Sequence, residues 1–258
     1  MRVHVDAERP NPRKLQPAVD ALKKGQVIVY PTDTGYAFGC AMSSVKGIAA
    51  IRKLKGLDER SHKPLTMIVS GLTDVGRFGV LGNSHFRLVR RLLPGPYTLV
   101  LAATSEVPKS MHNRHHEVGL RVPDHLVCRM LIGELGEPLL NGSVTPGEEA
   151  TPELEDAEEL ENRYAREVAV TVDVGPQWPD PSTVLRMIGD DIEVLREGKG
   201  TTVRERRGGA AAAAGANRAR RQHGPAARPA GRWLLADLHR PAVQHRPDPA
   251  ASAAADRA

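Results

Sequence analysis

The sequence has few of the features that mark secreted, disulfide-bonded or membrane proteins. It contains only two cysteines, Cys40 and Cys128, and neither lies in a CxxC pair, which excludes a disulfide framework. No apolar run approaches the roughly 20 residues that a membrane helix needs. The N-terminal segment MRVHVDAERPNPRK has no apolar signal core. We therefore expect a soluble cytoplasmic protein without a membrane partner.

Several common catalytic motifs are also missing. The chain has neither GxGxxG nor GxxxxGK[ST], so a Rossmann or P-loop nucleotide site is not supported. It also lacks the GxSxG elbow of the α/β-hydrolases. His112, His115 and His116 cluster in MHNRHHE, but a metal site needs fixed geometry and further ligands. We interpret that segment as a polar loop and predict no metal site built from a cluster of protein ligands.

The charge is distributed unevenly along the chain. Residues 204–258 hold 11 Arg, no Lys and 4 acidic residues, a net charge of 11 − 4 = +7, and the whole chain is +5. Residues 1–203 therefore carry 5 − 7 = −2, and the high pI belongs to the C-terminal segment. Residues 204–258 are rich in Ala, Arg and Pro, a composition that cannot bury enough apolar surface to offset the entropy of ordering.

We predict one folded domain over residues 1–203 and a disordered tail over residues 204–258. A basic tail can tether RNA. The absence of Lys amid abundant Ala, Arg and Pro instead favours an extension without a role of its own, or a shifted reading frame of a GC-rich gene.

The apolar periodicity alternates between helical and extended segments. Asn11 and Pro12 predict a helix start and Gly25 its end. By the same criteria, strands and helices alternate and a β-rich segment closes the domain, which predicts an α/β sheet with at least one antiparallel pair. The helices are expected within 11–25, 44–56, 84–93, 124–136 and 153–165. The strands are expected at 26–30, 65–70, 97–103, 118–123 and 168–175, with a hairpin over 182–198 and a loop over 31–40.

The expected loop after the first strand carries candidate ligand-binding groups. Thr32, Asp33 and Thr34 place two hydroxyls and a carboxylate at the C-terminal end of a strand, where open α/β sheets bind ligands. An ordinary turn, in which Asp33 and Thr34 satisfy local backbone groups, explains the same residues equally well.

A second group is cationic. Residues 52–64 contain Arg52, Lys53, Lys55, Arg60 and Lys63, which is a concentration of positive charge that can hold phosphates. A solvated helix end, where cations are favoured by the helix dipole, is the interpretation that the segment alone favours.

Further polar residues stand at the ends of expected strands. Arg121 lies in an apolar strand, so it must either pair with a buried carboxylate or face a pocket. Ser143 ends the segment PLLNGS, Ser182 and Thr183 open a later strand, and Arg196 lies near the end of the last one. Each of these signals is weak by itself.

Taken in order, these segments resemble the YrdC/YciO family. The matching pieces lie within residues 27–198: PTDTGYAFGC, KPLTMIV, LLPGPYTLVL, VGLRVPDH, GEPLLNGS, PSTVL and VLREG. The resemblance is to the YciO-type branch in particular, through GYAFGC and HFRLVRRLLPGPYTLVL. It implies a twisted, mixed open sheet flanked by helices around a central, positively charged cavity.

The resemblance also implies an activity. Well-understood members of this family are L-threonylcarbamoyladenylate synthases, which use L-threonine, bicarbonate and ATP with Mg²⁺ and supply the t6A modification of tRNA. By analogy, Lys55 and Ser143 would act at the phosphates, with Mg²⁺ near Ser143. The residues near the amino-acid substrate would be Thr32, Thr34, Lys63, Arg121 and Ser182. The other nucleotide-binding residues would be Lys53, Arg60, Thr183 and Arg196.

The chain departs from the synthase pattern in three segments, one of which has Gly35-Tyr36-Ala37-Phe38 where synthases have Val-Tyr-Gly-Leu. Leu57 stands where synthases carry the arginine of a Lys-x-Arg pair, and Thr145 replaces the asparagine of a Ser-x-Asn sequence. Three functions therefore stay open: a threonylcarbamoyladenylate synthase or a close relative with another acceptor, a non-catalytic protein that binds tRNA or double-stranded RNA, and a module that binds a small ligand without turnover.

Overall fold

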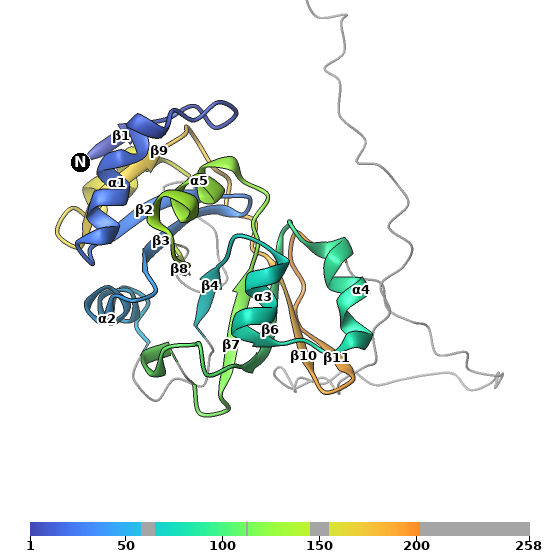
Figure 1. Ribbon diagram of the computed structural model, residues 1–258. Coiled ribbons are helices and arrows are strands. Elements are labelled where there is room, and N and C mark those ends of the chain that lie inside the picture. Colours follow the sequence, from blue (N-terminus) through green and yellow to red (C-terminus); the bar gives the residue numbers. More distant parts are fainter. Residues whose placement is uncertain (58–64, 112, 145–154, 202–258) are drawn as a thin grey trace, which may run out of the picture.

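The computed structural model describes residues 1–57, 65–111, 113–144 and 155–201 (Figure 1). These ranges fold into helices packed against one large mixed sheet, which confirms the predicted fold class. The predicted tail at 204–258 lies outside the described residues. In chain order the elements are β1 (Arg2–His4), α1 (Pro12–Lys23), β2 (Val27–Thr32), β3 (Gly35–Ala41), α2 (Val45–Leu54), β4 (Thr66–Ile68), α3 (Leu72–Phe78), β5 (Gly79–Val80), α4 (Asn83–Leu92), β6 (Tyr97–Ala103), the 3₁₀ turn η1 (Lys109–Met111), β7 (Glu117–Arg121), α5 (Leu126–Leu135), β8 (Leu139–Ser143), α6 (Ala157–Arg163), β9 (Val168–Asp173), β10 (Thr183–Ile188) and β11 (Asp191–Arg196).

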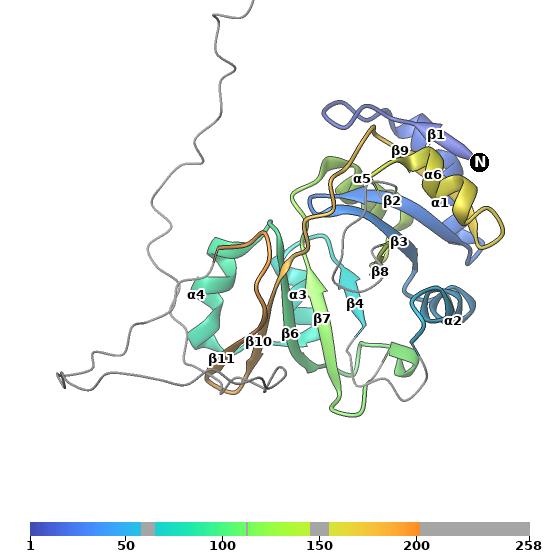
Figure 2. The same ribbon diagram turned by 180° about the vertical axis from the view of Figure 1, so that it is seen from behind.

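The sheet mixes parallel and antiparallel pairs. Its strand order is β1-β9-β2-β3-β8-β4-β7-β6-β10-β11, with β5 paired to β6 beside this path. Parallel pairs join β1 to β9, β9 to β2, β4 to β7 and β6 to β10, and the other neighbours are antiparallel. The sheet twists strongly, so that β2 and β3 run across the view while β6 and β7 stand upright (Figures 1 and 2).

Both faces of the sheet are covered, and the alternation of side chains along β2 shows how. Val27 and Val29 belong to the apolar core that includes residues of α2, α3 and α4. Ile28 and Tyr30 point the other way, into the core shared with α1 and α5. A strand with apolar residues at every position is expected where both faces are buried.

Most local predictions are confirmed. The helix after Asn11 begins at Pro12, the Asn11 side chain accepts a hydrogen bond from the Arg13 amide, and Gly25 follows with φ of +72°. The strand expected at 97–103 has those bounds. The C-terminal hairpin pairs β10 with β11 around Gly189.

The segment 31–40, predicted as a loop, was interpreted wrongly. Its second half is β3, which pairs with β2 on one side and β8 on the other. Glycine in this segment serves packing: a Cβ on Gly39 would lie 2.6 Å from Cε1 of Tyr30 on the paired strand. Only the residues around Thr32–Gly35 form a turn.

Two helix starts also differ from prediction. Asp124 does not cap the helix after β7, because α5 begins at Leu126 with His125 as its N-cap. The Asp124 carboxylate instead lies 3.9 Å from Nη2 of Arg129. The helix expected at 153–165 is described only as α6, whose N-cap is Asp156. The elements β1, α3, β5, η1 and β8 were not predicted. Of these, β1, β5 and η1 have only two or three residues, too short to carry a periodic pattern.

The described part of the chain contains no helix with the length and apolar character needed to cross a bilayer. Both cysteines are free and buried. Cys128 donates a hydrogen bond to the Pro31 carbonyl at 3.1 Å, and burial raises the pKa of its thiol.

The packing against Gly39 gives a stability prediction. Replacing Gly39 with Ala should lower the free energy of unfolding by about 1–3 kcal/mol, because the new methyl group overlaps the Tyr30 ring. Gly133→Ala in α5 is the matched control, since nothing lies within 4 Å of its added Cβ. The control should be neutral or stabilise by up to about 1 kcal/mol. Urea unfolding followed by circular dichroism measures both, and equal stability of the two variants would contradict this packing.

Candidate functional site

Four strands end or begin at one edge of the sheet. Because β4 and β7 are parallel, and β6 and β10 run opposite to β7, the C-terminal ends of β4 and β7 meet the N-terminal ends of β6 and β10. The tip of the β2–β3 hairpin reaches this edge, as the contact between Asp33 and Arg121 establishes. The edge therefore gathers polar residues from segments that are far apart in the sequence.

The hairpin tip is a tight turn whose hydroxyls are largely engaged. The buried Thr32 hydroxyl donates to the Gly35 carbonyl at 2.7 Å and accepts from the Thr34 amide at 3.1 Å. Gly35 has a φ of +103°, and a Cβ there would lie 3.0 Å from Cα of Pro179. Thr32 thus stabilises the turn, while Thr34 is partly exposed at its tip.

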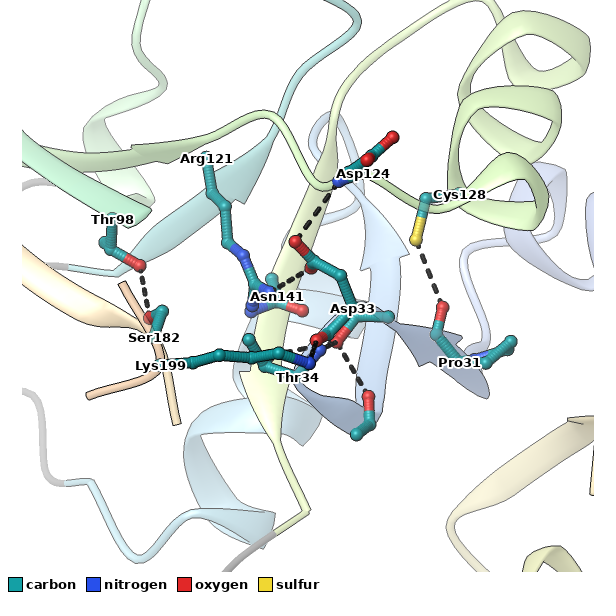
Figure 3. Close-up of polar contacts among 12 residues, drawn as sticks. Pro31, Asp33, Thr34, Thr98, Arg121, Asp124, Cys128, Asn141, Ser182 and Lys199 are labelled. Atoms are coloured by element: carbon teal, nitrogen blue, oxygen red, sulfur yellow. Dashed lines mark hydrogen bonds and ion pairs between the residues drawn. The ribbon is translucent and has the colours of Figure 1, made fainter. Parts of the chain in front are cut away.

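A buried ion pair joins this turn to β7. The guanidinium of Arg121 donates through Nη2 to Oδ1 of Asp33, and the Asp124 amide donates to Oδ2 of the same carboxylate at 3.2 Å (Figure 3). The side chains of Arg121 and Asp33 are only 4% and 11% exposed. Of the two possibilities open for Arg121, the structure shows pairing with an internal carboxylate. The Asp33 carboxylate therefore binds groups that lie far from its own turn in the sequence.

Two buried nitrogen atoms beside this ion pair have no hydrogen-bond partner among the described residues. They are Nε of Arg121 and Nδ1 of His125. Burial lowers the pKa of His125, and the carboxylates of Asp33 and Asp124 act in the opposite direction. An unsatisfied buried polar atom costs about 1–3 kcal/mol, so an acceptor atom placed at Arg121 Nε is favoured.

The strands β10 and β11 bring a second group to the same edge. The Ser182 hydroxyl lies 2.8 Å from that of Thr98 on β6 (Figure 3). Arg196 donates to the Ser182 carbonyl through Nη2 at 2.7 Å and Nε at 3.0 Å. Thr183 is fully buried, and its hydroxyl donates to the Gly200 carbonyl at 2.6 Å, so this hydroxyl serves the fold.

Lys199, which the sequence analysis did not select, connects the two groups. Its backbone amide donates to the Pro181 carbonyl at 2.8 Å, next to Ser182. Its ammonium donates to the Asp33 carbonyl, also at 2.8 Å. Figure 3 shows the side chain spanning from Ser182 to the hairpin turn.

Lys55 and Ser143 form a separate contact. The Lys55 ammonium donates to the Ser143 carbonyl at 2.7 Å, and the Lys55 stem packs over Gly142. Ser143 pairs with Ala37 on β3, and the Val144 amide donates to the Tyr36 carbonyl at 3.3 Å. This pair therefore lies against β3 a few residues from the hairpin tip.

Of the remaining predicted residues, the structure describes Lys53 alone. Lys53 is exposed on α2. Arg60, Lys63, Thr145 and His112 lie outside the described residues. The predicted central cavity stays a prediction. Within the described ranges, no three His, Cys, Asp or Glu side chains are grouped in a way that could hold a metal ion.

Comparison with known proteins identifies the fold family. The Sua5/YciO/YrdC family model, described as telomere recombination, matches residues 20–198. The chain belongs to the Sua5/YciO/YrdC family. The resemblance inferred from the sequence motifs is thereby confirmed.

The relatives within this family include proteins of the YciO type and synthases. An uncharacterized protein of Haemophilus influenzae is 37% identical over 204 residues, covering 77% of this chain and 96% of that protein. YciO of Escherichia coli is 33% identical over 199 residues, covering 76% and 95%. A threonylcarbamoyl-AMP synthase of Bos taurus is 30% identical over 189 residues, covering 72% of this chain but 65% of the synthase.

Solved structures of family members share the fold. The crystal structure of E. coli YciO superimposes with a TM-score of 0.70, covering 78% of this chain and 96% of that one. Sua5 of P. abyssi, crystallised with L-threonine, gives a TM-score of 0.68 at 22% identity, covering 77% and 57%. At 22% identity, the superposition with Sua5 shows that the fold is shared and carries no conclusion about activity.

The ion pair at the hairpin gives a second stability prediction. Asp33→Asn should lower the free energy of unfolding by about 3 kcal/mol, because it leaves the buried Arg121 guanidinium without a compensating charge. Asp124→Asn is the matched control: its side chain is 67% exposed and its backbone donor is retained. That control should change stability by less than about 0.5 kcal/mol. Equal urea midpoints for the two variants would contradict the assignment.

Proposed function

We propose that this protein forms threonylcarbamoyl-AMP from L-threonine, bicarbonate and ATP at the sheet edge described above. The main support is the convergence of Arg121, Ser182 and Arg196 with the Thr32–Gly35 turn, where Arg121 holds one buried donor without a partner. Family members with sequences 30% identical are threonylcarbamoyl-AMP synthases.

The proposed reaction needs a site that binds anions and does not need a nucleophilic side chain. The threonine amine combines with bicarbonate, releasing water, to give a carbamate anion. A carbamate oxygen then attacks the α-phosphorus of ATP, and the bond to the β-phosphate breaks as pyrophosphate leaves with the electron pair. Cationic donors offset the repulsion between the two anions and stabilise the charge that develops on the phosphates.

The described residues suit different parts of this task. Nε of Arg121 can donate to a carboxylate or phosphate oxygen while Nη2 stays on Asp33. Arg196 and the Ser182 hydroxyl lie at the same edge. Lys55 would contact phosphate from the side of β8, next to Ser143. Mg²⁺ would enter with ATP as part of the substrate, held by phosphate oxygens.

Product formation tests the proposal directly. The full chain is incubated with ATP, Mg²⁺, bicarbonate and L-threonine, and threonylcarbamoyl-AMP is measured by mass spectrometry. Lys55→Ala should lower kcat/KM about 100-fold, the effect of removing one preorganised donor. Lys46→Ala, in the first turn of the same helix, is the control and should be near wild type. Undiminished activity of Lys55→Ala would reject the site, and ATP binding without product would reject the synthase.

A second candidate is the binding of tRNA or double-stranded RNA without catalysis. The observation in its favour is on α4, where Arg87, Arg90 and Arg91 are exposed on a helix without acidic residues. None of the ion pairs among the described residues involves these arginines. Their spacing places them on one helix face, where they can follow a phosphate backbone.

RNA binding through α4 predicts a specific salt dependence. Replacing Arg87, Arg90 and Arg91 with Gln should weaken the binding of double-stranded RNA. It should also reduce the slope of log affinity against log salt by roughly 1 for each arginine that contacts a phosphate. Fluorescence anisotropy at several salt concentrations measures both. An unchanged slope in the triple variant would exclude this helix as the RNA contact.

A further inference from the structure

The segment after β11 is fitted closely against the start of β10. The Gly198 amide donates to the Thr183 hydroxyl at 3.0 Å, and the same hydroxyl donates to the Gly200 carbonyl at 2.6 Å. The Lys199 amide, between them, bonds to the Pro181 carbonyl. The backbone on both sides of Lys199 is therefore fixed to β10.

Both flanking glycines are required by this close approach. A Cβ on Gly198 would lie 2.1 Å from the Pro181 carbonyl oxygen, and one on Gly200 would lie 2.4 Å from Cε1 of Tyr97. The sequence Gly-Lys-Gly thus lets the chain lie flat on its neighbours while it presents a single long side chain. That side chain extends to the hairpin turn and ends on the Asp33 carbonyl (Figure 3).

The charge balance at the edge adds a reason for a cation here. The positive charge of Arg121 is offset by the carboxylate of Asp33. None of the ion pairs among the described residues involves Lys199, and its ammonium uses one of its three donors on the Asp33 carbonyl. Lys199 therefore brings a positive charge that no described carboxylate compensates.

We infer that Lys199 is a binding and positioning residue of this site: it holds the turn that carries Thr32, Thr34 and Asp33, and it offers its remaining donors to an anionic ligand. The inference rests on the proposed function for the nature of the ligand, a phosphate-containing anion. In the sequence, Lys199 stands 166 positions from Asp33. The segment after the last strand is thereby a part of the site.

The test uses the full chain, with Lys199→Met and Lys199→Arg as variants and Lys24→Met as the control. Lys24 is exposed at the end of α1. Two readouts are taken without turnover: amide hydrogen exchange of the Thr32–Gly35 turn, and calorimetric binding of inorganic pyrophosphate. In the Lys199→Met variant, the amide hydrogens of the turn should exchange roughly fivefold faster. The variant should also bind pyrophosphate about tenfold more weakly, as expected for the loss of a charge-assisted hydrogen bond. Lys199→Arg should restore both to within about threefold, and Lys24→Met should match wild type.

Unchanged exchange or unchanged pyrophosphate affinity in Lys199→Met would overturn the inference, as would a wild-type chain that binds no pyrophosphate. The results distinguish a failure of the Lys199 inference from a failure of the proposed synthase activity. Both effects in a chain that forms no threonylcarbamoyl-AMP would reject the synthase and support Lys199. Product formation with neither effect would reject Lys199 alone.

Discussion

The buried pair between Arg121 and Asp33 is the interaction on which the arrangement of the candidate site depends. A guanidinium almost removed from water must have a partner, since the cost of an uncompensated buried charge is several kcal/mol. Asp33 provides that partner from the tip of a hairpin 88 positions away in the sequence. The pair thereby holds the β2–β3 hairpin at the C-terminal end of β7. The backbone amide of Asp124 donates a further hydrogen bond to the same carboxylate.

Around this pair, the mixed directions of the strands explain why one edge holds so many polar groups. In a sheet of parallel strands only, this edge would hold the C-terminal ends of the strands and none of their N-terminal ends. Here β4 and β7 end where β6 and β10 begin, so residues that follow one strand lie beside residues that precede another. Ser182 reaches Thr98, and the return of the chain after β11 brings Lys199 to the hairpin. The site is assembled from both kinds of strand end.

Members of this family share a fold, but the chemistry of each member depends on individual side chains. The Sua5/YciO/YrdC fold is shared with YciO and with Sua5. The chemistry depends on individual donors, and Leu57 is one position at which this chain lacks the arginine expected of a synthase. The buried Nε of Arg121 and the ammonium of Lys199 are the donors through which an anion would be recognised here.

Most local elements, and the need of Arg121 for a partner, could be predicted from the order of the amino acids. The cap at Asn11 and the apolar run at 97–103 depend on neighbours along the chain, so the helix and the strand were predictable. The apolar setting of Arg121 required a partner but did not say which. That Asp33 is the partner, and that Lys199 contacts the hairpin turn, follows from the register and twist of the sheet, which bring distant segments together. The same reason explains β3, where Gly39 is small to admit the ring of Tyr30 and does not mark a loop.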